Sequence, residues 1–165
     1  AGDAVRRGIA KAKELGACVL ALRNASHIGR IGTYAELAIA HGCAFVSFVN
    51  VADHRDAQAT WGAAEARLGT NPFTTGVPGP NGEPVVLDMA TTTIAAGKAR
   101  VAYNKGIEAP EGSLIDAGGN PTNDPTGFMR DKTGALRSFG LHKGGGLAIM
   151  SEIMAMAFAG GQGTV

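Results

Sequence analysis

Apolar positions in the first fifty residues alternate between helical and strand spacing. An apolar residue at every third or fourth position, closed by Gly16, predicts a helix over Asp3–Leu15 with its first residue as the N-cap. The continuous apolar run of Ala17–Leu22 predicts a strand. The capping-box spacing of a threonine and a glutamate predicts a second helix over 33–42, and Cys43–Val49 has the pattern of another strand. Helices and strands therefore alternate in an α/β pattern.

The rest of the chain contains a long polar loop and then a second set of elements. Val51–Arg67 has no periodic pattern, and a loop of that length inside a domain usually has a function. After it we expect a turn at Gly69–Pro72, a hairpin of strands over Phe73–Val77 and Val85–Leu87, a helix over Ala95–Gly106, a turn-rich stretch over Glu111–Gly140 and a helix over Leu147–Ala159. The hairpin predicts a mixed strand order. The last helix is apolar nearly all round, which predicts burial in a core or in a subunit interface.

Composition and charge limit the class of protein. The 165 residues are 45% hydrophobic and 18% charged, which is enough apolar material for one compact core, so we expect a single domain. The net charge of +1 gives no reason to expect nucleic acid or an acidic membrane as a partner. The longest apolar stretch, Leu147–Gly160, is shorter than the roughly 20 residues of a membrane span.

Cysteine placement and the chain ends bear on compartment and extent. Cys18 and Cys43 each lie in an apolar run, where we expect inert, buried thiols. No basic and apolar leader precedes them, so a reduced, cytoplasmic protein is expected. The chain begins without methionine and stops directly after an apolar helix. We therefore expect it to be a piece of a longer protein.

His27 and Lys143 are the first candidates for chemistry. His27 follows a predicted strand and lies beside Gly29, and an imidazole near its reference pKa can exchange a proton at neutral pH, as carbonyl reduction requires. A surface histidine in a turn has the same pattern. Lys143 precedes three glycines and a helix start, where amides and an ammonium group can hold an anion, although a solvated lysine fits equally well. No Gly-x-Gly-x-x-Gly follows a strand, so a nicotinamide cofactor would need a fold other than Rossmann.

Three weaker patterns complete the inventory of candidate sites. The bend at Asp88–Thr93 offers a carboxylate, hydroxyls and amides, but Asp88 or a threonine can equally well cap the helix that follows. Gly29–Gly32 matches the Gly-x-x-Gly of a KH nucleic-acid loop, which the near-zero net charge disfavours. We expect no metal site, because the four histidines lack ligand spacing; they are His27, His41, His54 and His142.

Several short motifs, taken in order along the chain, resemble one family. The motifs are Asn-Ala-Ser-His-Ile-Gly-Arg-Ile-Gly-Thr-Tyr at 24–34, Gly-Thr-Asn-Pro at 69–72, Asp-Met-Ala-Thr-Thr at 88–92 with Ala-Gly-Lys at 96–98, and His-Lys-Gly at 142–144. Together they resemble the malate/L-lactate dehydrogenase family, which also includes ureidoglycolate, sulfolactate and 2,3-diketogulonate enzymes. Phe48–Val51 and Ser113–Asp116 most resemble its hydroxycarboxylate dehydrogenase B branch. The resemblance covers nearly all of the chain.

The resemblance implies a fold and an activity. It implies an α/β domain with a mixed, largely antiparallel sheet flanked by helices, which binds NAD or NADP without a Rossmann fold. Residues 1–165 would be the single cofactor-binding and catalytic portion of a longer two-domain enzyme. That enzyme would act as a homodimer and reduce a 2-oxo acid reversibly to a 2-hydroxy acid.

The resemblance also implies roles for individual residues. The expected dinucleotide contacts are Asn50, Val51, Asp88, Met89, Ala90, Thr91, Thr92, Lys143 and Gly144, and the candidates for the substrate pocket are Thr70 and Asn71. His27 lies where some members have a proton-transferring histidine, whereas others have one in an N-terminal segment absent from this chain. Two departures, Thr60–Ala63 in place of Pro-x-Gly-Gly and Thr92 in place of serine, lie beside the expected pocket.

Three functional hypotheses remain open at this point. They are a dehydrogenase, a nucleotide-binding module without catalysis, and a KH-like nucleic-acid binder. Oxidation of NADH that depends on a 2-oxo acid separates the first from the second, and salt-dependent RNA binding identifies the third. The sequence does not name the 2-oxo acid or choose between NAD and NADP.

Overall fold

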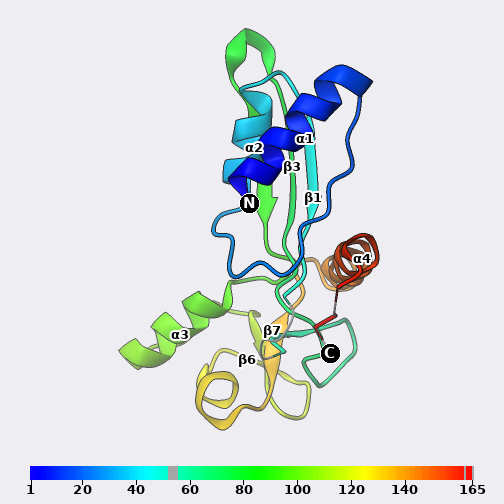
Figure 1. Ribbon diagram of the computed structural model, residues 1–165. Coiled ribbons are helices and arrows are strands. Elements are labelled where there is room, and N and C mark those ends of the chain that lie inside the picture. Colours follow the sequence, from blue (N-terminus) through cyan, green and yellow to red (C-terminus); the bar gives the residue numbers. More distant parts are fainter. Residues whose placement is uncertain (52–55, 162, 165) are drawn as a thin grey trace.

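A computed structural model describes residues 1–51, 56–161 and 163–164 (Figure 1). The helices are α1 (Gly2–Leu15), α2 (Gly32–Ile39), α3 (Ala96–Lys105) and α4 (His142–Ala159), with a short 3-10 helix at Pro80–Gly82 and a π-helix at Gly127–Asp131. The strands are β1 (Phe45–Phe48), β2 (Gln58–Ala59), β3 (Phe73–Val77), β4 (Val85–Met89), β5 (Leu114–Ile115), β6 (Pro121–Thr122) and β7 (Ala135–Arg137). Residues 52–55, part of the predicted polar loop and including His54, lie outside the described residues.

The first sheet is antiparallel and has the order β1-β3-β4. Phe73 on β3 lies opposite Phe48 on β1, and their ring centroids are 5.3 Å apart. α2 covers β3 and β4, and α1 lies against α2 (Figure 1). A Cβ atom on Gly76 would lie 2.8 Å from the Ile39 side chain, so the glycine in β3 permits the close approach of α2. The hairpin predicted on either side of Asn81-Gly82 is confirmed.

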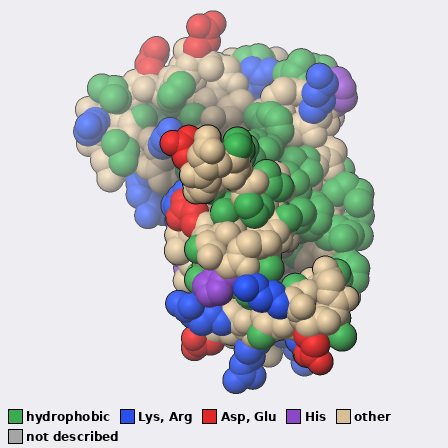
Figure 2. Space-filling model, turned by 90° about the horizontal axis from the view of Figure 1, so that it is seen from above, with side chains coloured by type: hydrophobic (Ala, Val, Ile, Leu, Met, Phe, Trp, Pro, Cys, Tyr) green, Lys and Arg blue, Asp and Glu red, His purple; other side chains and the backbone are tan. Residues whose placement is uncertain are grey.

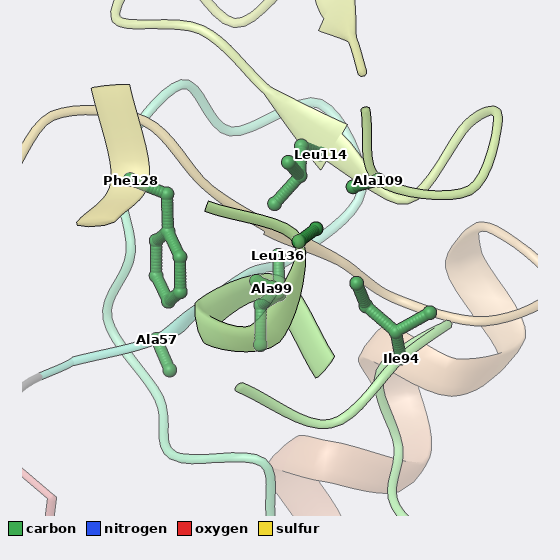
Figure 3. Packing of buried hydrophobic residues seen from close by; sticks show 8 residues of the cluster. Ala57, Ile94, Ala99, Ala109, Leu114, Phe128 and Leu136 are labelled. Atoms are coloured by element: carbon green, nitrogen blue, oxygen red, sulfur yellow. The ribbon is translucent and has the colours of Figure 1, made fainter. Parts of the chain in front are cut away.

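The second sheet has the order β2-β7-β5-β6, with β2 and β7 parallel and the other pairs antiparallel. Its hydrophobic cluster includes the buried face of α3, and Figure 3 shows Ala99 of that helix among the other members. The cluster consists of Ala57, Ile94, Ala99, Ala102, Ala109, Leu114, Phe128 and Leu136. Two sheets with one parallel pair, flanked by helices, confirm the predicted mixed and largely antiparallel α/β fold.

The N-terminal region departs from the prediction in three places. Ala17–Leu22 forms no strand, because no neighbouring strand pairs with it, and Val19 is 80% exposed. Asp3 lies in the first turn of α1 and not at its N-cap, which is Ala1. The expected capping box of α2 does not form, because the N-cap is Ile31 and Thr33 lies inside the first turn, while the Glu36 carboxylate accepts a hydrogen bond from Arg30.

Two other expectations need correction. The stretch 111–140 contains three short strands, β5 to β7, and a π-helix, whose few residues give too little periodic pattern to detect. Cys18 and Cys43 are free and only partly buried, and both lie outside the strands. The prediction of fully buried strand thiols is therefore wrong.

α4 has its small residues inside and its large apolar residues outside. Gly144, Gly145, Ala148 and Ser151 are buried against the strand ends, whereas Ile153 is 45% exposed. Burial in the core, the first of the two predicted alternatives, is wrong, because only the face with small residues packs inward and the large apolar side chains are exposed. Burial in a subunit interface stays a prediction. In the part of the chain that the structure describes, no helix has the length and apolar character of a membrane span.

Hydrophobic side chains also gather over one side of the end that carries α1 and the β3–β4 hairpin (Figure 2). The large exposed hydrophobic residues of the N-terminal part include Leu15, Val19, Leu20, Leu22 and Val46. Together these residues form an apolar surface, in contrast to the isolated hydrophobic residues found on most protein surfaces.

Two glycines of α4 give a matched test of how closely this helix packs. A Cβ atom on Gly144 would lie 2.3 Å from the Phe139 carbonyl oxygen, whereas one on Gly146 has no neighbour within 4 Å. We expect Gly144→Ala to destabilise the fold by about 1–3 kcal/mol through overpacking. Gly146→Ala should stabilise it by about 0.5–1 kcal/mol, because alanine favours a helix. Urea unfolding of both variants checks this, and equal effects would contradict it.

Candidate functional site

An open groove with a volume of about 2020 Å³ borders the first sheet, the N-terminal segment and the end of α4. Four of the predicted site residues line it: His27, Asn50, Val51 and Thr70. These residues come from the segment before α2, the end of β1 and the turn before β3. The groove therefore collects candidate proton-transfer, cofactor and substrate residues from three separate parts of the sequence.

His27 is exposed at the groove. The sequence predicted that it follows a strand, and this prediction is wrong, because no strand precedes it. The Gly29 amide donates a hydrogen bond of 3.1 Å to His27 Nδ1, and the Tyr34 hydroxyl donates to the Ile28 carbonyl. These two hydrogen bonds fix the loop that carries His27, which no strand supports. Because Nδ1 accepts a hydrogen bond, the neutral ring carries its hydrogen on Nε2, which leaves Nε2 for a ligand.

The Asp88 carboxylate is occupied by the protein itself. Its Oδ2 accepts a hydrogen bond of 2.8 Å from the Gly32 amide, and its Oδ1 accepts one of 2.8 Å from the Thr74 hydroxyl. Asp88 thus caps α2 across the sheet and does not cap α3, whose N-cap is Ala95. The Arg30 guanidinium lies 3.5 Å from the same carboxylate.

Arg30 joins two carboxylates at the N-terminus of α2. It donates a hydrogen bond of 2.8 Å to Glu36 and lies beside Asp88. The hydrogen bond to Glu36, followed by the attraction of that carboxylate, raises the pKa of Arg30 above its usual value. Arg30 therefore stays charged, and it compensates the partly buried Asp88.

Thr91 and Thr92 are buried, and their hydroxyl groups are also engaged. The Thr91 hydroxyl lies 2.9 Å from two acceptors, Gln58 Oε1 and the Thr70 carbonyl, which share its one hydrogen, and the Thr92 hydroxyl donates to the Ile94 carbonyl. The Gln58 side chain in turn donates to Ser138 at 2.9 Å. This buried network joins the two sheets, and Gln58 and Ser138 are members that the sequence analysis missed.

Lys143 and Gly144 lie in the first turn of α4, which begins at His142, five residues earlier than predicted, and follows two residues with positive φ. These residues are Gly140, with φ 52°, and Leu141, with φ 59°. Gly144 is buried against Phe139, and its amide donates to the Phe139 carbonyl. Lys143 is exposed and has no ion pair with any of the described residues. Of this pair, Lys143 is the group that can bind an anion.

Glu152 on α4 connects the two segments that carry Asn50 and Asn71. Its Oε1 accepts a hydrogen bond of 3.4 Å from Asn50, and its Oε2 accepts one of 2.7 Å from Asn71. Thr164 donates to both oxygens, through its amide and its hydroxyl. Glu152 is the charged residue that interrupts the apolar run of this helix, and this interruption could have identified it from the sequence as a residue with polar partners.

The structure brings the predicted residues together in two adjacent groups. The first lines the groove, and the second consists of the buried Thr91, Thr92 and Gly144 and the partly buried Asp88. A backbone hydrogen bond of 2.9 Å from Thr91 to Thr70 connects the groups. Met89 and Ala90 are half-buried, and Lys143 belongs to neither group, because it is exposed and does not line the groove. Within the described ranges, no cluster of three or more histidine, cysteine or acidic residues can hold a metal ion.

The chain belongs to the malate/L-lactate dehydrogenase family, whose family model matches residues 1–164. It is 43% identical over 162 residues to an L-lactate dehydrogenase from Cupriavidus necator, covering 98% of this chain and 46% of the relative. It is 42% identical over 164 residues to hydroxycarboxylate dehydrogenase B from Escherichia coli K12, covering 99% and 45%. The chain therefore spans less than half the length of these curated relatives.

A solved structure agrees with the fold. The delta1-piperideine-2-carboxylate reductase from Pseudomonas syringae is 34% identical to this chain, with a TM-score of 0.87. The match covers 98% of this chain and 47% of that one. The two-sheet arrangement described above is thus the fold of this family.

Asp88 and Glu36 provide a matched test of the α2 cap. Asp88→Ala should destabilise the protein by about 1–3 kcal/mol, because the buried Gly32 amide loses its acceptor. Glu36→Ala, which removes the exposed partner of the same arginine, should cost less than about 1 kcal/mol. Thermal unfolding of the two variants measures the difference. A larger loss for Glu36→Ala would contradict this assignment.

Proposed function

We propose that this chain is the cofactor-binding and catalytic portion of a longer NAD(P)-dependent oxidoreductase that interconverts 2-oxo and 2-hydroxy acids. The observation that carries the proposal is the family match over residues 1–164 together with the groove that collects His27, Asn50, Val51 and Thr70. The names of the relatives include lactate and hydroxycarboxylate dehydrogenases and an imino-acid reductase. We therefore place the substrate among small acids with a carbonyl or imine carbon next to the carboxylate.

The residues present fit a dinucleotide in part. The groove exceeds the usual 300–1,000 Å³ of small-molecule sites, so an extended ligand has room. Lys143 is exposed at the start of α4 and suits a phosphate. The Asp88, Thr91 and Thr92 side chains have protein partners, so we assign them to shaping the site and leave cofactor contact to backbone atoms of 88–92.

His27 is our candidate for proton transfer. The chemistry that a bound nicotinamide dinucleotide supplies is hydride transfer to the C2 carbon of the acid. The ketone oxygen then gains negative charge and needs a proton. His27 Nε2 can deliver that proton in the imidazolium form and take it back in the reverse direction, while the loop bonds at Gly29 and Tyr34 hold its place.

The direct test is oxidation of NADH or NADPH by the complete enzyme in the presence of small 2-oxo acids. We expect oxidation that depends on the acid, in at least one combination of cofactor and acid. Cofactor binding without any turnover would instead support a nucleotide-binding module. The family resemblance also implies a homodimer, which light scattering of the purified enzyme measures.

Lys143→Ala tests the phosphate contact. Loss of one charge-assisted bond should weaken NADH binding by about 1.5–3 kcal/mol, measured by fluorescence titration of the complete enzyme. Lys105→Ala is the matched control, because Lys105 is an exposed lysine in the last turn of α3. An unchanged affinity in the Lys143 variant would remove this residue from the site.

His27→Ala tests proton transfer. Turnover per folded active site should fall about 10²- to 10⁴-fold, and NADH affinity should stay nearly the same. His41→Ala is the matched control, since His41 is an exposed histidine next to α2. A loss below about tenfold would assign the acid to a residue outside this chain.

A further inference from the structure

We propose that Glu152 is a positioning residue that fixes the cofactor edge and the substrate pocket of the groove relative to each other. This inference rests on the proposed function, but its structural half can be tested without it. Glu152 lies on α4, and its carboxylate accepts hydrogen bonds from Asn50 at the end of β1 and from Asn71 at the start of β3. The proposed function does not use this residue.

The two asparagines flank residues that face the groove. Val51 follows Asn50, and Thr70 and Pro72 lie on either side of Asn71, and all three line the groove. Asn71 itself is fully buried behind that wall. A movement of either asparagine therefore moves a segment of the wall, and the Glu152 carboxylate holds both asparagines through hydrogen bonds.

The orientation of the Asn71 amide is determined by its neighbours. Its nitrogen donates to Glu152 Oε2 at 2.7 Å and to the Ala148 carbonyl at 3.1 Å, and both of these partners are acceptors only. A flipped amide would place oxygen against oxygen. Asn71 Oδ1 consequently faces away from α4 and has no hydrogen-bond partner among the described residues.

The unpaired oxygen indicates that this arrangement is not the most stable one for the site. A buried acceptor without a hydrogen-bond partner destabilises the folded state, because it has lost its bonds to water. Asn71 also has φ 32°, a left-handed conformation that asparagine tolerates better than most residues. The Glu152 carboxylate holds Asn71 in this conformation, and Asn71 in turn sets the direction of the backbone at Thr70. The arrangement therefore lowers the stability of the folded protein.

A carboxylate suits this position because Asn50, Asn71 and Thr164 all approach Glu152 with hydrogen-bond donors. Two donors approach each oxygen, from Asn50 and the Thr164 amide on one side and from Asn71 and the Thr164 hydroxyl on the other. A glutamine has the same shape but would direct an amide group at one pair of donors. Glu152→Gln therefore disturbs the geometry with minimal change in volume.

The test compares Glu152→Gln with Glu65→Gln in the complete enzyme, because Glu65 is an exposed carboxylate away from the groove. We expect Glu152→Gln to lower kcat about 10- to 100-fold, since small misplacements of reacting groups reduce the rate steeply. The dissociation constant of NADH should change much less than kcat, by less than about tenfold, because Glu152 does not itself line the groove and reaches it only through the asparagines. A kcat per folded active site within twofold of wild type would overturn the proposal.

A double-mutant cycle and hydrogen exchange separate the possible causes. If Glu152 acts through Asn71, the combined variant Glu152→Gln/Asn71→Ala should be no slower than the slower single variant, whereas multiplied effects would overturn this route. Amide exchange at 48–51 and 69–72 should increase in Glu152→Gln and not in Glu65→Gln. Unchanged exchange would overturn the structural role even if the wild type were inactive. An inactive wild type with increased exchange would overturn only the proposed function and the link to catalysis.

Discussion

The close approach of α4 to the ends of β1 and β3 is the constraint on which the rest of the structure depends. The Ala148 carbonyl accepts a hydrogen bond from Asn71 in the turn before β3, and Gly144 packs against the Phe139 backbone after β7, where a Cβ atom does not fit. Glu152 then completes the contact with hydrogen bonds to Asn50 and Asn71. Because the small residues of α4 face inward, the large apolar residues of the helix lie on its outer face.

The sequence predicted the elements that have a clear period or a clear stop signal. The helix ended by Gly16, the hairpin at Asn81-Gly82 and the last helix are all present, although the last helix begins at His142 and includes the three glycines that were expected to precede it. The strand at Ala17–Leu22 failed because an apolar run does not reveal whether another strand will pair with it. Burial of α4 failed for a related reason, since hydrophobicity alone does not identify the face that packs.

The candidate site was predictable as a set of residues but not as a set of roles. Position in a motif located His27, Asn50 and Thr70, which share one groove. Motif position did not show that the Asp88 carboxylate accepts a hydrogen bond from the Gly32 amide, because the two residues are 56 positions apart in the sequence. The sequence analysis did not identify Gln58 and Glu152 for the same reason, since their hydrogen-bond partners lie far away in the sequence.

The central claim is that a nicotinamide dinucleotide binds along the groove wall formed by the end of β1 and the turn before β3, and that Lys143 in the first turn of α4, outside that wall, binds one of its phosphates. The most direct measurement is amide hydrogen exchange of the complete enzyme with and without saturating NADH or NADPH. The account predicts slower exchange in the bound enzyme at 48–51, at 69–72 and in the first turn of α4. Protection confined to other parts of the chain, with these three segments unchanged, would contradict it.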